Sequence, residues 1–282
     1  MIPLTAAAIA AATDGHLTPG TDPSLPVNAP ASIDSRHIHP GGIFAALPGQ
    51  HTDGHHHAPA AVAAGAALVL ASRPLPAPAV QVADVTRALG DLACHVAGQL
   101  PATVIGITGS NGKTTTKDLA AQVLAHHGPV TATDRSFNNE LGFPLTVLRA
   151  TPDTRYLILE MGARGRGHIS YLCDLVTPHA GIVLNVGTAH LGQYPDGQAG
   201  IAAAKSELIT ALPRPITAGW PSSTPTTHSS PRWPRSPPPA RDGGASIPTP
   251  TACTPGMYTS RPTARRASPC TPPKARHPSC SA

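Results

Sequence analysis

An apolar segment that leads through a glycine-rich turn into a helix is the feature that most limits the folds open to this chain. Thr103–Ile107 reads as a buried strand, residues 108–112 as the turn, and Lys113–His127 as a helix that Gly128-Pro129 ends. Val130–Thr133 follows as a second strand. This order of strand, helix and strand predicts the βαβ unit of a parallel sheet.

The same alternation continues along the chain. Further apolar strands are predicted at Tyr156–Leu159 and Gly181–Leu184, and a last helix from about Ile201 to Ala211. Three apolar side chains at helical spacing support the helix that follows the turn: Leu119, Val123 and Leu124. Strands that alternate with helices favour a mostly parallel sheet.

The turn has the chemistry of a phosphate-binding loop. Its backbone N–H groups and the following helix N-terminus can converge on phosphate oxygens. Lys113 would then reach the terminal phosphates, and Thr114 would give its hydroxyl to Mg²⁺. The strict pattern has a glycine where this chain has Ile107, so the loop is a variant. We predict ATP binding here, in preference to a plain glycine-rich turn with a surface lysine. The predicted ATP contacts are Thr108, Gly109, Ser110, Asn111, Gly112, Lys113, Thr114 and Thr115.

The composition of the chain changes abruptly after Pro213. Residues 1–213 carry 11 Lys and Arg against 14 Asp and Glu, whereas residues 214–282 carry 9 against 1 and contain no Leu, Val, Phe or Glu. Such a segment cannot build a core, so we predict disorder over residues 214–282. Its basic residues are not interleaved with aromatic residues and show no amphipathic period, so we expect no nucleic-acid partner. The segment reads like a GC-rich gene translated in the wrong frame, and we hypothesise a frameshift.

A second, smaller α/β unit is predicted upstream of the turn. Thr5 caps a helix that stops near Gly15, and Asp84 caps another helix over Val85–Val96 that Gly98 closes. Between them the predicted elements are a strand within residues 42–47, a helix over 58–64 and a strand over 67–70. The predicted fold class is therefore α/β: a small N-terminal domain over residues 1–98, an incomplete P-loop-type domain with a mostly parallel sheet over 99–213, and a disordered tail over 214–282.

The remaining composition excludes several classes of protein. The five cysteines are scattered and show no C-x-x-C spacing, which argues against a zinc knuckle or a disulfide framework. No apolar run approaches the length that spans a bilayer, and the alanine-rich N-terminus lacks a basic segment before it. We therefore expect no membrane partner and a cytoplasmic location.

Three further motifs accompany the glycine-rich turn, and together they resemble the Mur ligase family. They are Phe137-Asn138-Asn139-Glu140-Leu-Gly-Phe-Pro144, Glu160-Met-Gly-Ala163 and Asn185-Val-Gly-Thr-Ala-His190-Leu191. Thr108–Thr115 is similar to the shortened phosphate loop of that family, and the resemblance extends from about Met1 to Pro213. Within the family, the motifs are most similar to the branch that adds D-alanyl-D-alanine.

The resemblance implies a magnesium site. It assigns Glu160 and His190 as magnesium ligands beside Thr114, and Lys205 as a lysine that becomes carbamylated and helps to hold a second magnesium. The chemistry of Glu160 agrees, because a carboxylate at the carboxyl edge of a parallel strand is a hard oxygen ligand where α/β sheets bind their ligands. Without the resemblance, His190 would be a satisfied polar residue and Lys205 a solvated helix lysine. The implied catalytic residues are Lys113, Glu160, His190 and Lys205.

Substrate contacts are also implied by the resemblance. Asn138 and Asn139 match asparagines near the reacting carboxylate, although adjacent amides after a turn can equally cap the next helix. Asp34, Ser35 and Arg36 match contacts to a UDP-sugar, which makes residues 1–98 a UDP-N-acetylmuramoyl-binding domain. The run His55-His56-His57 is expected to be a loop variant, because neighbours in sequence seldom point at one ion.

The implied reaction joins D-alanyl-D-alanine to UDP-N-acetylmuramoyl-tripeptide with ATP and Mg²⁺, through an acyl phosphate, in a monomer. Family members have three domains, and the later half of the ATP domain and the third domain would lie beyond residue 213. We therefore expect an open sheet edge and no ligation by the chain as written.

Three alternatives remain. One is another ligase of the same mechanism, such as the diamino-acid-adding Mur ligase or folylpolyglutamate synthase, against which Glu160-Met-Gly-Ala163 argues. Another is a non-catalytic remnant that binds ATP or a UDP-sugar. The last is a P-loop kinase or general NTPase, which would usually show the stricter glycine spacing and no uridine-binding unit upstream.

Overall fold

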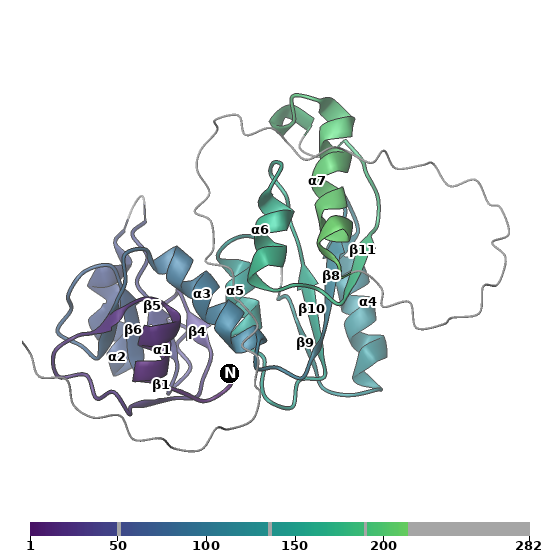
Figure 1. The fold of residues 1–282 in the computed structure, drawn as a ribbon. Coiled ribbons are helices and arrows are strands. Elements are labelled where there is room, and N and C mark those ends of the chain that lie inside the picture. Colours follow the sequence, from purple (N-terminus) through teal and green to yellow (C-terminus); the bar gives the residue numbers. More distant parts are fainter. Residues whose placement is uncertain (50–51, 135–136, 189–190, 214–282) are drawn as a thin grey trace, which may run out of the picture.

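The computed structural model describes residues 1–49, 52–134, 137–188 and 191–213, and these form two larger sheets and one two-stranded sheet, with helices around them (Figure 1). His190 and the whole of residues 214–282 lie outside the described residues. The predicted α/β class with a mostly parallel sheet is confirmed.

The N-terminal sheet has five short strands in the order β2-β7-β6-β5-β4. Strands β4 to β7 run parallel, and β2 pairs with β7 in the antiparallel sense. The strands are β2 (His16–Leu17), β4 (Ala31–Ser32), β5 (Ile43–Ala45), β6 (Leu68–Ala71) and β7 (Ala79–Gln81). A separate antiparallel pair is formed by β1 (Leu4–Thr5) and β3 (Pro26–Val27).

Local sequence explains the helices of this unit. The Thr5 side chain caps α1 (Ala6–Ala12) by accepting a hydrogen bond from the N–H of Ala8, and the Asp84 carboxylate caps α3 (Val85–Ala97). The other two are η1 (Gly54–His57) and α2 (Ala58–Ala63). Both predicted N-caps are therefore confirmed.

The second sheet contains the glycine-rich turn. Its four strands are all parallel, in the order β11-β8-β10-β9. They are β8 (Thr103–Thr108), β9 (Val130–Ala132), β10 (Tyr156–Glu160) and β11 (Ala180–Val183). Within the described part of the chain, β11 pairs only with β8, so its outer edge is open as expected.

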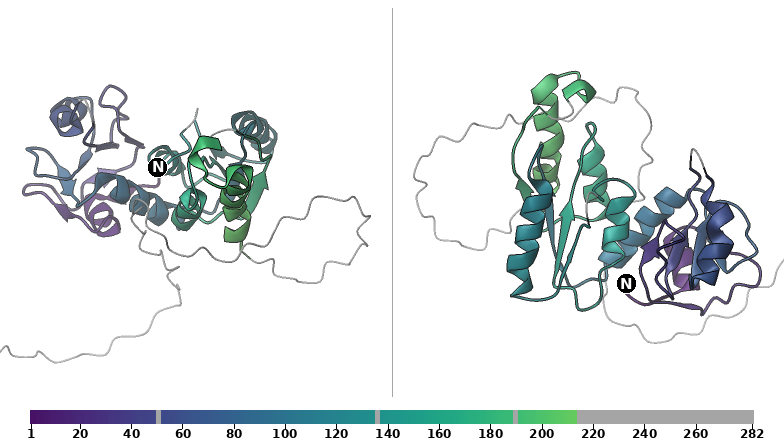
Figure 2. Two further views of the ribbon diagram at one scale, coloured as in Figure 1. Left: turned by 90° about the horizontal axis from the view of Figure 1, so that it is seen from above. Right: turned by 180° about the vertical axis from the view of Figure 1, so that it is seen from behind.

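Helices lie on both faces of this second sheet. They are α4 (Lys113–Ala125), α5 (Gly142–Val147), α6 (His168–Leu175) and α7 (Gly197–Ala211), with η2 (Leu191–Gln193) before α7. Figures 1 and 2 show α4 on the opposite side of the sheet from α6. No helix among the described residues is long and apolar enough to cross a bilayer.

One hydrophobic cluster extends through both units. Helix α3 packs against α1 and β6 of the first unit and against α5 and α6 of the second. Its Leu89, Leu92 and Val96 side chains are fully buried in the same cluster as Phe143 and Leu148 of the second unit. The two sheets are therefore joined by a packed helix.

Helix α4 differs from what its apolar spacing suggests. The helix forms where it was predicted, but Leu119 and Val123 are 58% and 61% exposed. Its buried side chain is Lys117, whose ammonium donates to the Thr133 carbonyl at 2.7 Å. A satisfied cation therefore occupies the inner side of the helix, and the apolar side chains lie outside.

Candidate nucleotide and substrate site

The glycine-rich loop joins the carboxyl end of β8 to the start of α4. Gly112, the residue before α4, has a φ of +81°, a left-handed conformation that favours glycine. The first N–H groups of α4, from Lys113 to Thr115, have no acceptor within the helix. The loop therefore presents unpaired backbone donors and the positive end of a helix at one point.

Asn185 holds this loop in shape. Its side-chain oxygen accepts hydrogen bonds from the N–H groups of Ser110 (3.0 Å) and Asn111 (3.1 Å), and its amide nitrogen donates to the Asn111 carbonyl. Asn185 follows β11, which neighbours β8, so the carboxyl ends of the two strands lie together. Asn185 was not among the predicted site residues, and its position just after an apolar strand is the signal that could have identified it.

Glu160 lies at the end of β10, beside the loop. Its carboxylate is 1% exposed and accepts one hydrogen bond from the Thr114 hydroxyl (2.9 Å) and another from the Asn138 amide (2.7 Å). The Glu160 N–H in turn donates to the Thr133 hydroxyl. The structure therefore brings three of the predicted site residues into direct contact.

Two lysines lie next to this group. The Lys113 ammonium donates to the Gly109 carbonyl at 2.8 Å. Lys205 of α7 is 5% exposed, and among the described residues its ammonium makes no hydrogen bond or ion pair. Burial, together with the charge of Lys113, lowers the pKa of Lys205 to about 8. Lys205 is therefore a largely buried residue whose amine has a larger neutral fraction near pH 8 than an ordinary lysine has.

The polar groups present suit a hard divalent cation. Glu160 provides a carboxylate and Thr114 a hydroxyl, which are the oxygen ligands that Mg²⁺ prefers. Within the described residues there is no group of three His, Cys, Asp or Glu side chains that would hold a metal on its own. His190, the other predicted ligand, is outside those residues.

The two adjacent asparagines have different partners. Asn138 contacts Glu160, whereas the Asn139 side-chain oxygen accepts a hydrogen bond from the N–H of Gly142 at the start of α5. Asn139 therefore caps the next helix, which was the other interpretation of this pair. It also lines a cavity of about 340 Å³ beside α3 and α6.

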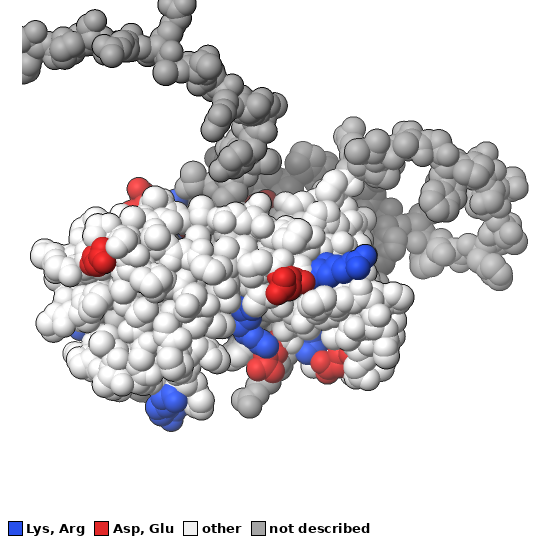
Figure 3. Space-filling view, turned by 90° about the horizontal axis from the view of Figure 1, so that it is seen from below, with Lys and Arg blue, Asp and Glu red and all other residues white. Residues whose placement is uncertain are grey.

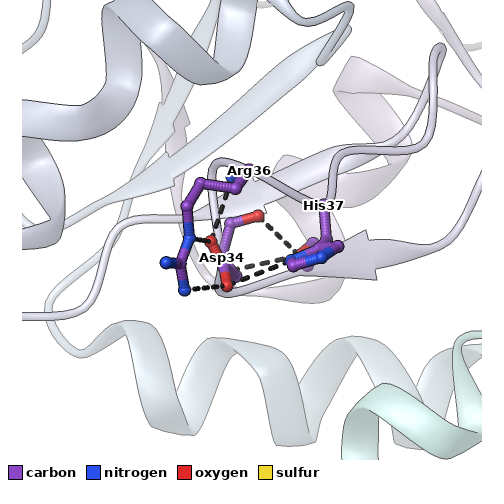
Figure 4. A network of polar contacts seen from close by, with 4 residues as sticks. Asp34, Arg36 and His37 are labelled. Atoms are coloured by element: carbon purple, nitrogen blue, oxygen red, sulfur yellow. Dashed lines mark hydrogen bonds and ion pairs between the residues drawn. The ribbon is translucent and has the colours of Figure 1, made fainter.

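The predicted UDP-sugar contacts lie on a loop after β4. Figure 4 shows Arg36 and His37 around the carboxylate of Asp34, with Arg36 donating two side-chain hydrogen bonds to it. The guanidinium and the N–H of Arg36 hold the pKa of Asp34 well below its usual range. Two cavities of about 620 Å³ each border this loop. One is also lined by Phe137 of the second unit, and the other by Ser35.

The three consecutive histidines do not gather around one point. His55 is 3% exposed, its Nδ1 lies 2.5 Å from Asp53, and its Nε2 accepts a hydrogen bond from the N–H of Ser72. His57 contacts the Thr52 hydroxyl instead. The run forms the short helix η1 and not the loop that was expected, and the side chains of His55 and His57 have separate partners. On the face seen in Figure 3, Lys and Arg are interspersed with Asp and Glu, so neither sign of charge is concentrated there.

Comparison with known proteins places these features in one family. The profile of the Mur ligase family, catalytic domain, matches residues 31–96, and that of the Mur ligase middle domain matches residues 107–226, which continues past Pro213. The UDP-N-acetylmuramoyl-tripeptide--D-alanyl-D-alanine ligase of Mycobacterium tuberculosis is 50% identical over 240 residues, 76% of this chain and 47% of that protein.

Two solved structures have the same fold. UDP-N-acetylmuramoylalanyl-D-glutamyl-2,6-diaminopimelate--D-alanyl-D-alanyl ligase from Acinetobacter baumannii has a TM-score of 0.67 at 35% identity, over 75% of this chain and 47% of that one. MurF ligase from Thermotoga maritima in complex with ADP has a TM-score of 0.59 at 32% identity, over 66% and 44%. The chain spans about half the length of these relatives. From its profiles, identity and fold, the chain belongs to the Mur ligase family.

Proposed function

We propose that this chain carries the ATP-binding and UDP-sugar-binding parts of an ATP-dependent ligase that joins D-alanyl-D-alanine to UDP-N-acetylmuramoyl-tripeptide, and that these parts carry out the first step, formation of the acyl phosphate. The observation that carries the proposal is the contact of Glu160 with both Thr114 and Asn138. In these roles, Glu160 would be a hard metal ligand, Thr114 would belong to the phosphate loop, and Asn138 would donate to a substrate carboxylate, and the three residues are in contact. The relatives whose names give a UDP-N-acetylmuramoyl peptide and D-alanyl-D-alanine as the groups joined support the substrate class.

Residues 99–213 would bind the nucleotide. The N–H groups at the start of α4 and the Lys113 ammonium would contact the phosphates, and Asn185 would keep the loop in place. The relative from Thermotoga maritima was solved with ADP, which supports a nucleotide at this loop. Residues 1–98 would hold the UDP-sugar, with Asp34, Ser35 and Arg36 at the cavities that border their loop.

The magnesium ligands would be Thr114, Glu160, His190 and a carbamylated Lys205. Bound Mg²⁺ offsets the negative charge of the phosphoryl group that is transferred. Glu160 is the one carboxylate of the described group, so a further anionic ligand is needed. A lysine whose pKa is lowered to about 8 has a larger neutral fraction, and its Nζ would form a bond to CO₂ and release a proton to give a carbamate.

The reaction would take place in two steps. The tripeptide carboxylate attacks the γ-phosphorus of ATP and displaces ADP, which gives an acyl phosphate. The amine of D-alanyl-D-alanine then attacks the acyl carbon, and phosphate and a proton leave as the amide forms. Asn138 would orient the carboxylate, and Lys113 would offset charge on the transferred group. From the Acinetobacter baumannii relative we carry over 2,6-diaminopimelate as the third residue of the tripeptide.

The first step can be tested without the acceptor. The 282-residue chain would be mixed with ATP, Mg²⁺ and UDP-N-acetylmuramoyl-tripeptide, and hydroxylamine would trap any acyl phosphate as a hydroxamate. We expect tripeptide-dependent ADP release and hydroxamate formation, and amide product would then be sought with D-alanyl-D-alanine. Nucleotide binding without tripeptide-dependent ADP release would contradict the proposal and would leave a nucleotide-binding protein.

A further inference from the structure

A cavity of about 340 Å³ lies where α3, the loop before α5 and α6 meet. Asp84 and Arg87 at the start of α3 line it on one side, and Arg164 and Tyr171 line it on another. Helix α3 packs against both α5 and α6 (Figure 1). The lining residues of the cavity come from the start of α3 and from the second unit, so the cavity lies between the two units. Its volume suits the end of a side chain better than a whole substrate.

The cavity shares a wall with the group around Glu160. Gly162 lines the cavity, and its N–H donates to the Asn138 carbonyl at 2.9 Å. A Cβ atom on Gly162 would lie 2.7 Å from the Asn138 side-chain oxygen, so a larger residue does not fit between them. Asn138 contacts Glu160 directly. A substrate residue whose carboxylate is held at Asn138 would therefore have its side chain next to the cavity.

The lining carries both signs of charge. Burial raises the pKa of Tyr171, and the carboxylates of Asp91, Glu140 and Asp84 raise it further, so negative charge gathers around this ring. The Asp84 carboxylate already caps α3. Arg87, at the cavity edge, already forms an ion pair with Asp91. Glu140 is the carboxylate of the lining that remains for a ligand.

Arg164 provides the opposite charge. Its neighbour Arg166 forms an ion pair with Asp196, but among the described residues Arg164 has no carboxylate partner. Arg164 and Glu140 are both exposed at the cavity, while Leu172 is buried and gives it an apolar wall. A ligand that fits has a short apolar chain ending in one cation and one anion.

We propose that this cavity binds the far end of the third residue of the tripeptide, and that it selects a side chain carrying both an ammonium and a carboxylate. Arg164 binds the carboxylate, Glu140 binds the ammonium, and Leu172 contacts the methylene groups between them. The inference rests on the proposed function, because the reacting carboxylate of the same residue must lie at Asn138. A lysine side chain, which has the ammonium alone, leaves Arg164 without a partner.

Calorimetry on the 282-residue chain tests this with three ligands. They are UDP-N-acetylmuramic acid, the UDP-linked tripeptide ending in 2,6-diaminopimelate, and the same tripeptide ending in lysine. We expect the diaminopimelate tripeptide to bind about tenfold more tightly than the lysine tripeptide, since one charge-assisted contact differs. Arg164→Gln should abolish this ratio, and the matched control Arg166→Gln should preserve it. Glu140→Gln should weaken both tripeptides, whereas Asp153→Asn should weaken neither.

The outcomes separate this inference from the proposed function. UDP-N-acetylmuramic acid should bind equally well to every variant, which also shows that each variant is folded. An unchanged ratio in Arg164→Gln, or equal binding of the two tripeptides to the unaltered chain, would overturn the subsite while leaving the ligase proposal intact. If the unaltered chain does not bind UDP-N-acetylmuramic acid at all, the proposed function fails and this inference fails with it.

Discussion

Glu160 is the residue on which the proposed chemistry depends most. Replacing it with Gln keeps the volume and removes the charge, so its contacts to Thr114 and Asn138 lose their ionic partner. We expect Glu160→Gln to reduce tripeptide-dependent ADP release by roughly 100-fold, because charge on the transferred group would no longer be offset at this position. Asp153→Asn is the control, because Asp153 is exposed and precedes β10, whereas Glu160 lies at the other end of that strand. Equal rates for the two variants would exclude Glu160 from the reaction.

Lys205 gives a prediction about pH. Its pKa is lowered from 10.5 to about 8 in the folded chain, so between these values the unfolded chain binds more protons. The free energy of unfolding should therefore rise with pH across that window, and below pH 8 the cost of the buried ammonium is present in full. In CO₂-free buffer, Lys205→Met should raise the free energy of unfolding at pH 7 by at most about 3 kcal/mol. Urea unfolding at several pH values checks this, and an unchanged slope in the variant would refute it.

Among the elements, α6 is held by a residue from a distant part of the chain. The Glu207 carboxylate of α7 accepts hydrogen bonds from the N–H groups of Gly167 (2.7 Å) and Ser170 (3.0 Å), at the start of α6. We expect Glu207→Ala to lower the free energy of unfolding by about 1–2 kcal/mol, because two donors lose their acceptor. Denaturant titration measures this, with Asp153→Ala as the control. If Glu207→Ala lowers the free energy of unfolding no more than Asp153→Ala does, water replaces the carboxylate as the acceptor.

The hydrogen bonds from Glu207 to α6 show why the sequence predicts some elements and misses others. Strand β10 was found because its apolar run ends in Glu160, and α3 because Asp84 caps it locally. Helix α6 was missed because its cap comes from Glu207, which no local pattern reveals. Strand β7 was missed because it is short and directly follows a segment with three prolines, which favour a loop. Long-range partners and short elements are therefore what the sequence alone does not supply.

The candidate site could likewise be predicted from the sequence only in part. Thr114 and Glu160 could be paired from the sequence because Thr114 lies at the start of the helix after the loop that follows β8, and Glu160 ends β10. The carboxyl ends of parallel strands lie at the same edge of a sheet. The hydrogen bonds from Asn185 to the glycine-rich loop depend on which strands are neighbours in the sheet. The cavity beside Asn138 depends on how α3 packs. Neither these hydrogen bonds nor the cavity can be predicted from the sequence of a single segment.

At the scale of the whole molecule, the shared hydrophobic cluster predicts that the two sheets unfold together. Leu92 of α3 is fully buried in the cluster, and α3 contacts both units, so a cavity at this position should weaken both. We expect Leu92→Ala to lower the free energy of unfolding by about 2–5 kcal/mol. The matched control is Leu119→Ala, which removes an exposed side chain of α4 and should change it by less than about 0.5 kcal/mol.

Hydrogen exchange measured by mass spectrometry distinguishes joint from separate unfolding. In Leu92→Ala, the peptides that contain β6 and β10 should both exchange faster, and by the same factor, because one opening exposes both sheets. Rapid exchange at β6 with full protection at β10 would instead mean that α3 belongs energetically to the first unit alone. The subsite proposed between α3 and α6 needs joint behaviour, since Arg164 and Glu140 can select a ligand only while both units hold their places around it.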